Sequence, residues 1–201
     1  MYLASIQTAT HQEQSVDHIM PRNKPRLELA LYARPKHPGT YHYALFTAPK
    51  TMEGPLAKHH SKNTLQIDAS GEATAPWRYE QTTIDKIESE SRLLVRVIIA
   101  KVLKPGDRAA LVLDNIPVHQ INGVDNADSE IFTCRTWARD ELLELRKQGV
   151  VSTELGGWED VERMALQYVD RKREQRRWDS AWTGSTEVPT MDLLEGKEVC
   201  E

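Results

Sequence analysis

The segment Leu93–Leu103 is the sequence feature that most restricts the fold of this chain. Its residues are almost all apolar and mostly β-branched, and only Arg96 and Lys101 interrupt them. A run that is apolar on both faces suits a central strand covered on both sides, because a half-exposed strand would alternate apolar with polar residues. The sequence therefore predicts a sheet with this strand in its interior.

Four shorter segments upstream show strand-like patterns. Leucines alternate with other residues in Arg26–Tyr32, and Tyr41–Thr47 is rich in aromatic and apolar residues. A turn with two prolines and a glycine separates the two segments. His59–Ile67 is predicted to return as the hairpin partner of the second segment, and Trp77–Ile84 to form a further short strand.

Helical patterns dominate the second half of the chain. Asp107–Leu113 predicts one or two helical turns, and apolar residues recur at helical spacing from Cys134 to Gly149. The last helix, about Trp158–Trp178, has acidic residues in its first turn and basic residues in its last, which matches the helix dipole. Strands followed by helices predict an α+β fold, with an antiparallel sheet of about four to five strands packed against C-terminal helices.

The length of 201 residues suits one domain, and 39% hydrophobic residues supply one core. Both end segments are polar and aperiodic. We therefore expect a flexible leader at residues 1–24, a single α+β domain at 25–182 and a flexible tail at 183–201.

Charge and composition exclude several classes of protein. A net charge of −4 disfavours nucleic-acid binding, and no apolar run approaches the roughly 20 residues of a membrane span. The first residues lack the pattern of a secretory signal, and two cysteines cannot form a disulfide framework, so a cytoplasmic or nuclear location is expected. We expect no cofactor and no metal, because no phosphate loop, dinucleotide fingerprint or metal-ligand spacing is present. The oligomeric state stays open.

Cys134 is the candidate chemical centre. Thr133 is a suitable N-cap, and the apolar helical spacing starts directly after it, which places Cys134 in the first helical turn. Unpaired backbone N–H groups there favour the thiolate and are able to receive an oxyanion during acyl transfer. Against this stands the ordinary structural role of a buried cysteine as an inert, small apolar residue.

A thiol nucleophile also needs a proton acceptor, and His42 is the candidate. Alternation along its strand places His42, Ala44 and Phe46 on one face, which we expect to look toward the helices. His60, or alternatively His59, lies on the expected neighbouring strand as the group that fixes the tautomer of His42. Each histidine taken alone is more often structural.

Two short motifs resemble those of circularly permuted papain-like thiol enzymes, namely the lecithin:retinol acyltransferase family and the PPPDE-type peptidases. Tyr41–Phe46 is similar to their histidine strand, and Phe132–Trp137 to the start of their cysteine helix. Thr133 departs from the asparagine that commonly precedes their cysteine. His60 is similar in place to the third polar residue of the acyltransferase branch.

The longer span Arg26–Trp178 also resembles a family of uncharacterised small proteins from filamentous fungi. Three motifs carry this second resemblance, and it brings no assigned activity: Arg34–Gly39, Lys58–His60 and Cys134–Trp137.

The papain-like resemblance implies a thiol hydrolase or acyltransferase. His42 would remove the proton of Cys134, and the thiolate would attack an amide, ester or thioester carbonyl of a small-molecule or peptide acyl substrate. Trp137, His59 and Gln120 are candidate pocket residues, with Gln120 a second oxyanion donor beside the backbone of Cys134. The alternative is a non-catalytic binding or assembly module that retains the fold. A small biosynthetic cyclase using the same cleft is a third possibility.

Overall fold

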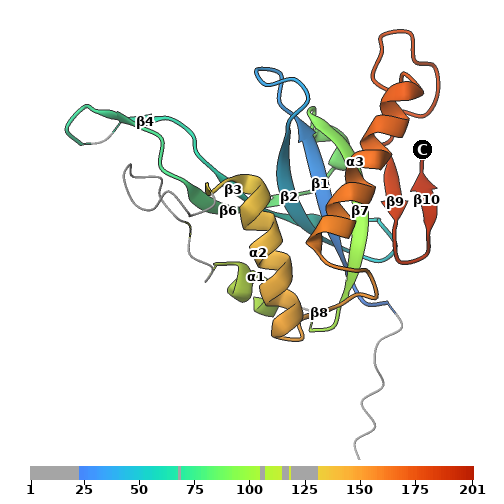
Figure 1. Cartoon of the computed structure of the whole chain (residues 1–201), viewed down its shortest axis with the longest axis horizontal. Helices are drawn as coiled ribbons and strands as arrows, with labels where there is room; N and C mark the ends of the chain where they lie inside the picture. The colour runs from blue at the N-terminus through green and yellow to red at the C-terminus, as the bar shows by residue number, and fades with distance from the viewer. Residues whose placement is uncertain (1–22, 68, 105–106, 115–117, 119–130) are drawn as a thin grey trace, which may run out of the picture.

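The computed structural model describes residues 23–67, 69–104, 107–114, 118 and 131–201. These residues form an eight-stranded sheet, a separate two-stranded ribbon and the helices beside them (Figure 1). The strands are β1 (Arg26–Ala33), β2 (Tyr41–Ala48), β3 (Leu56–Lys62), β4 (Gln66–Ile67), β5 (Ala73–Thr74), β6 (Arg78–Ile84), β7 (Leu93–Val102), β8 (Val151–Ser152), β9 (Thr190–Asp192) and β10 (Lys197–Cys200). The helices are η1 (Ile87–Ser89), α1 (Asp107–Asp114), α2 (Cys134–Lys147) and α3 (Trp158–Glu174).

The strand order is β10-β9-β7-β1-β2-β3-β6, and β8 pairs with the end of β7. Every pairing in the sheet is antiparallel except that of β7 with β9, which is parallel. The predicted α+β class with a largely antiparallel sheet is therefore confirmed. The sheet has more strands than the four to five expected.

The interior of the sheet is built by β7 and β1. Only Leu94 and Lys101 of β7 are not fully buried, and β1 is buried from Arg26 to Tyr32. This burial confirms the interior position predicted from the apolar run, because both faces of these strands meet other parts of the chain.

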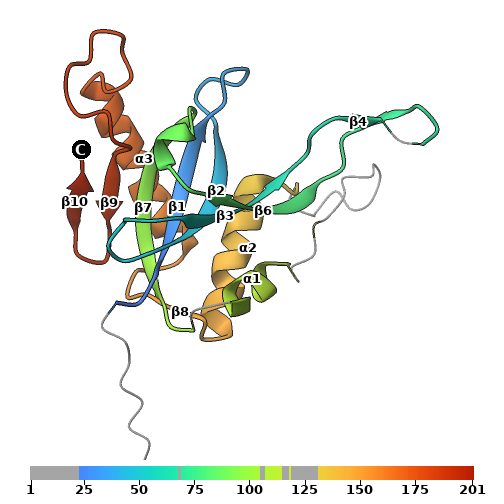
Figure 2. The ribbon, with the colours of Figure 1, turned by 180° about the vertical axis from the view of Figure 1, so that it is seen from behind.

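One side of the sheet, here called the helix face, packs against α2 and α3. The opposite views of Figures 1 and 2 place both helices on this side. The main core lies between the two layers, and a single cluster joins strand residues to helix residues. Its members include Leu29, Tyr43 and Leu45 from the strands and Cys134, Trp137, Leu142, Val161 and Ala165 from the helices.

The other side, here called the open face, carries a smaller apolar cluster around Tyr32, Ala44 and Phe46, against which Ile87 and Val188 pack. No α-helix of the described residues contributes to this cluster.

A buried ion pair lies between β1 and β7, where Arg96 Nε and a terminal nitrogen of Arg96 donate to the two carboxylate oxygens of Glu28 at 2.7 and 2.9 Å. The open face is thus polar in several places where the helix face is apolar.

The C-terminal segment differs from its expectation. Residues 190–200 were expected in a flexible tail, but β9 pairs with β7 and β10 pairs with β9. These strands have three and four residues, too short to show an apolar period, and their stability comes from pairing with β7. Residues 1–22 of the expected leader lie outside the described residues.

The predicted hairpin partner of β2 begins earlier than expected. It was placed at His59–Ile67, whereas β3 spans Leu56–Lys62 and β4 holds only Gln66–Ile67. Leu45 lies opposite His59 in the observed register, so His59 and His60 lie within the strand rather than at its end. This register decides which face each histidine takes.

The Glu28–Arg96 pair gives a test of the fold. Removing one partner, as in Arg96→Met or Glu28→Gln, is expected to cost about 3–5 kcal/mol of unfolding free energy, because the other charge stays buried and unpaired. The double variant Glu28→Met with Arg96→Met should recover most of this loss. Urea unfolding followed by circular dichroism measures the three values.

The exposed pair of Arg163 and Asp160 on α3 is the matched control, with an N–O distance of 2.8 Å. Arg163→Met should cost at most about 1 kcal/mol. Equal losses at the buried and the exposed pair would contradict the assignment.

Candidate functional site

The pleat of β2 separates the predicted catalytic residues. Tyr43 and Leu45 belong to the main core on the helix face, together with Cys134. Ala44 and Phe46 belong to the cluster on the open face. Because side chains alternate along a strand, His42 projects to the open face, away from Cys134.

Cys134 lies where the sequence predicted, at the start of α2. The side chain of Thr133 accepts a hydrogen bond from the backbone N–H of Thr136, and the Thr136 hydroxyl accepts one from the backbone N–H of Thr133, which completes a capping box. The thiol is buried at the edge of a hollow of about 410 Å³, whose lining also includes Arg34, Tyr43 and Glu162. The position in the first turn is confirmed.

The protonation of Cys134 does not favour a nucleophile. Burial raises the pKa of the thiol above its ordinary value, although the backbone N–H of Tyr43 and the charge of Arg34 act in the opposite direction. A raised pKa keeps the group a thiol at neutral pH. Within the part of the chain that the structure describes, no histidine is among the residues that shift its ionisation or line its hollow.

The expected pairing of Cys134 with His42 is therefore wrong. Alternation correctly grouped His42 with Ala44 and Phe46, but the face that meets the helices is the one carrying Tyr43 and Leu45. Both faces of β2 are apolar, so the pattern itself does not tell which of them the helices cover. The one-residue difference moves the imidazole to the far side of the sheet.

On the open face His42 is the end of a hydrogen-bonded chain. His42 Nε2 and His60 Nδ1 are 2.8 Å apart, and His60 Nε2 lies 3.0 Å from a carboxylate oxygen of Glu80. Lys62 forms an ion pair with the same oxygen of Glu80. His60 rather than His59 is thus the residue that orients His42, as one of the two alternatives predicted.

The carboxylate fixes the tautomers in this chain. The hydrogen bond from Lys62 lowers the pKa of Glu80, so the carboxylate is ionised and only accepts. His60 must then carry its proton on Nε2 and accept at Nδ1 from His42 Nε2–H. Within this row of hydrogen bonds, His42 Nδ1 is consequently the ring nitrogen that keeps an unused lone pair.

Both imidazoles are neutral at physiological pH. Burial lowers the pKa of His42 to about 3, assisted by His60 and by the positive charge of Lys58. Burial also lowers the pKa of His60. An imidazole with so low a pKa is a weak base. His42 therefore accepts a hydrogen bond more readily than it accepts a proton.

A cavity of about 720 Å³ lies beside this chain on the open face. Lys58, at one side of the cavity, donates to a carboxylate oxygen of Glu90 at 2.7 Å, and Tyr32 donates to the same oxygen at 2.6 Å. The charged residues that line the cavity balance, with three lysines against three carboxylates: Lys58, Lys62, Lys86, Glu80, Asp85 and Glu90. The arrangement is a polar hollow whose side chains are held by one another.

Of the remaining predicted residues, His59 and Trp137 lie on the helix face. His59 is buried, and its Nδ1 is 2.8 Å from the hydroxyl of Tyr79, whose ring lies 6.0 Å from that of Trp137. Burial lowers the pKa of His59 to about 4. Trp137 packs in the core beneath α2 and does not line the hollow at Cys134. Gln120 lies outside the described residues.

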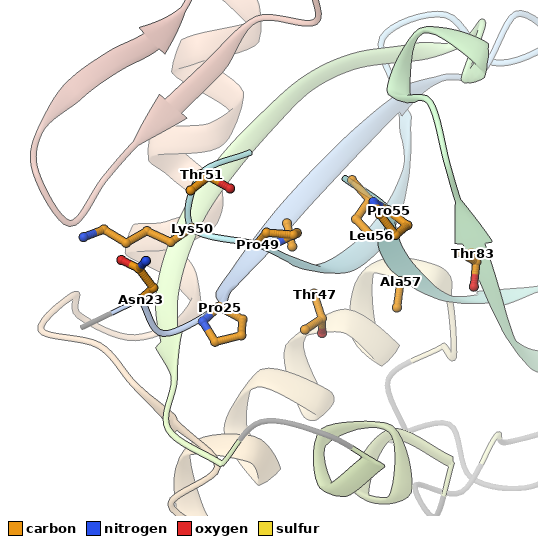
Figure 3. Close-up of a pocket in the computed structure, with 11 residues that line it drawn as sticks. Asn23, Pro25, Thr47, Pro49, Lys50, Thr51, Pro55, Leu56, Ala57 and Thr83 are labelled. Atoms are coloured by element: carbon orange, nitrogen blue, oxygen red, sulfur yellow. The ribbon is translucent and has the colours of Figure 1, made fainter. Parts of the chain in front are cut away.

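A third hollow, of about 540 Å³, is a groove at the end of β2 and the start of β3 (Figure 3). Three prolines line it, and Thr47, Ala57 and Thr83 contribute side chains from the helix face of the sheet. Among the described residues that line it, Lys50 is the one that carries a charge. The groove holds none of the predicted site residues and offers no pair of nucleophile and base.

Comparison with known proteins adds a family but no activity. A model of a family of unknown function, DUF6914, matches residues 24–200. The chain belongs to this family. Searches of curated proteins and of solved structures gave no match. The match extends over β9 and β10.

The described residues contain no group of three or more histidine, cysteine, aspartate or glutamate side chains arranged to hold a metal ion. No helix among them has the length and apolar character needed to cross a bilayer.

Several polar residues of these hollows were missed by sequence reasoning. Glu80 joins the histidine chain only through the pairing of β3 with β6, in which His60 lies opposite Glu80. The alternation of charged residues at 58, 60 and 62 was the available signal. Glu141 was missed as well, because a glutamate among leucines in a helix is expected to lie on the exposed side.

Glu141 is fully buried on α2. Burial, together with the negative charge of Asp140, raises its pKa to about 9, although the side chain of Trp137 acts in the opposite direction. The native state thus keeps a proton that the unfolded chain releases near pH 4.3. The Glu141 carboxyl therefore contributes a loss of stability as pH rises between these two values, of about 1.4 kcal/mol per pH unit, whereas the buried His42 and His59 contribute in the opposite direction below about pH 6.5.

Glu141→Gln should remove this slope, since glutamine does not ionise. Urea unfolding at several pH values between 5 and 8 measures the difference between wild type and variant. Glu144→Gln, at a half-buried position one turn along α2, is the control and should keep the wild-type slope. Parallel curves for wild type and Glu141→Gln would show that the carboxyl is ionised in the native state.

Proposed function

We propose that this chain is a non-catalytic binding module whose ligand occupies the cavity beside His60 on the open face. The observation that carries the proposal is the separation of the thiol of Cys134 and the imidazole of His42 by the sheet. Proton transfer needs the two groups within hydrogen-bond reach of each other. A Cys134–His42 hydrolase or acyltransferase, the other function considered, lacks this contact.

The pKa shifts of the Cys134 thiol and the His42 imidazole support the same non-catalytic proposal. A nucleophilic cysteine requires a lowered pKa, and a general base works best with a pKa near the working pH. Burial instead raises the pKa of Cys134 and lowers that of His42 to about 3. Each shift is in the direction that weakens catalysis.

The resemblance to permuted papain-like enzymes fits a relative without the catalytic pair. The first turn of α2 does pack against β2, with Cys134 and Tyr43 lining one hollow. The two motifs are therefore neighbours, as the resemblance implies, but a tyrosine takes the position that faces the thiol. We propose that the fold is retained and the acyl chemistry is lost, in a protein of the cytoplasm or nucleus.

The cavity favours a small polar ligand with little net charge. Its three lysines and three carboxylates balance, and Lys58 and Glu80 are already engaged with neighbouring groups of opposite charge. An ion that binds beside His60 would have to displace the pair of Lys62 with Glu80 or that of Lys58 with Glu90, whereas hydroxyl or amide groups are able to share them. Preformed hydrogen bonds also reduce the entropic cost of ordering side chains on binding.

Thiol labelling separates the two functions. In a Cys200→Ser background, iodoacetamide should modify Cys134 slowly, with an apparent pKa at or above the ordinary thiol value of about 8.5. His42→Ala should leave the profile unchanged, because the imidazole lies across the sheet. Mass spectrometry across a pH series provides the measurement. A profile centred well below the ordinary value and raised by His42→Ala would restore the thiol enzyme.

Ligand mapping tests the cavity. A library of small uncharged polar molecules is screened against the full chain by two-dimensional NMR of the backbone amides. Bound molecules should shift signals around His60 and Thr82, and Thr82→Trp, which fills the cavity, should abolish the shifts. Thr74→Trp, at an exposed position on β5, is the matched control. Shifts confined to the groove around Lys50 would place the binding site elsewhere.

A further inference from the structure

The two edge strands of the sheet are protected very differently. The strand order leaves β10 at one edge and β6 at the other. An edge strand presents unpaired N–H and C=O groups, and proteins blunt such edges with short strands, bulges, lysines or prolines. β10 has four residues, begins with Lys197, and its pairing with β9 shifts register between Glu198 and Cys200.

β6 lacks most of these devices, although it carries the charged residues Arg78 and Glu80. It pairs with β3 at every position from Arg78 to Ile84 without a register shift, and it contains neither lysine nor proline. Gln81, Thr82 and Thr83 at its centre are exposed. Among the described residues β3 is its only partner strand. The outer edge of β6 is thus a regular seven-residue template for another strand.

We propose that β6 of a second copy of this chain pairs with this edge, antiparallel and about a two-fold axis at Gln81. In this register Glu80 lies opposite Thr82 of the second copy, and Tyr79 lies opposite Thr83 of the second copy. Aromatic and β-branched residues form favourable cross-strand pairs. No two like charges lie opposite each other anywhere along the seven positions.

Neighbouring registers of the same symmetry are less favourable. An axis at Glu80 places the two Glu80 carboxylates opposite each other. An axis at Thr82 places Arg78 opposite Lys86 of the second copy. Like charges in directly opposed positions destabilise strand pairing. Of these three registers, the one about Gln81 alone opposes no like charges, and it is self-complementary, as an isologous interface requires.

This pairing would also join the two binding cavities. Glu80 and Thr82 line the cavity beside His60 and project from β6 on the open face. In the pair each Glu80 lies against Thr82 of the other copy, so each cavity gains a wall from the second chain. The interface is independent of the ligand, because main-chain hydrogen bonds supply its contacts.

Sedimentation velocity on the full chain tests the proposal by charge exchange. The wild type should sediment as a dimer of the 22.9 kDa chain at tens of micromolar. Gln81→Lys alone and Gln81→Glu alone should each weaken dimerisation by about tenfold or more, because two like charges then meet on the axis. An equimolar mixture of the two variants should recover the dimer as a mixed species, visible by native mass spectrometry.

Val199→Lys, on the opposite edge strand, is the matched control and should leave the dimer intact. Circular dichroism checks that each variant is folded, which is expected because Gln81 is exposed. A wild type that stays monomeric at several hundred micromolar would overturn the proposal, as would a mixture that fails to recover the dimer. Loss of the dimer in Val199→Lys would also overturn it by moving the interface to β10.

Discussion

The pleat of β2 is the constraint on which the rest of the site depends. β2 is held on one side by β1 over eight paired positions, from Arg26 with Ala48 to Ala33 with Tyr41, and on the other side by β3. Bringing His42 to the helix face would require a one-residue slip in both ladders. Such a slip would also carry Leu45 out of the main core and Ala44 into it. The separation of His42 from Cys134 is therefore a property of the whole sheet.

Burial then sets the chemistry on each face. On the helix face the thiol of Cys134 and the carboxyl of Glu141 are both kept protonated, because charge is costly among apolar neighbours. On the open face the same effect keeps His42 and His60 neutral, while the ion pairs of Glu80 with Lys62 and Glu90 with Lys58 supply the charges. One face is thus a core and the other a set of fixed hydrogen-bonding groups. Fixed groups of this kind serve recognition without requiring proton transfer.

The sequence predicted the positions of strands and helices better than it predicted which face of the sheet each side chain takes. The interior position of β7 followed from its β-branched run, and the N-cap Thr133 followed from its place before the apolar spacing of α2. The sequence did not predict which face of β2 meets the helices. His42, Ala44 and Phe46 lie on one face and Tyr43 and Leu45 on the other, and both sets include apolar residues. β9 was missed because three residues carry no period and its place is decided by pairing with β7. Likewise the role of Glu80 depends on its position opposite His60, which only the register reveals.

Binding and assembly would be thermodynamically linked if both use β6. Glu80 and Thr82 belong at once to the cavity beside His60 and to the edge that a second copy would occupy. A ligand that contacts the second chain binds the pair more tightly than the single chain, so it must strengthen dimerisation by the same factor. A ligand confined to one chain has equal affinity for both states and leaves the equilibrium unchanged. The dependence of ligand affinity on protein concentration would therefore distinguish a shared cavity from two separate ones.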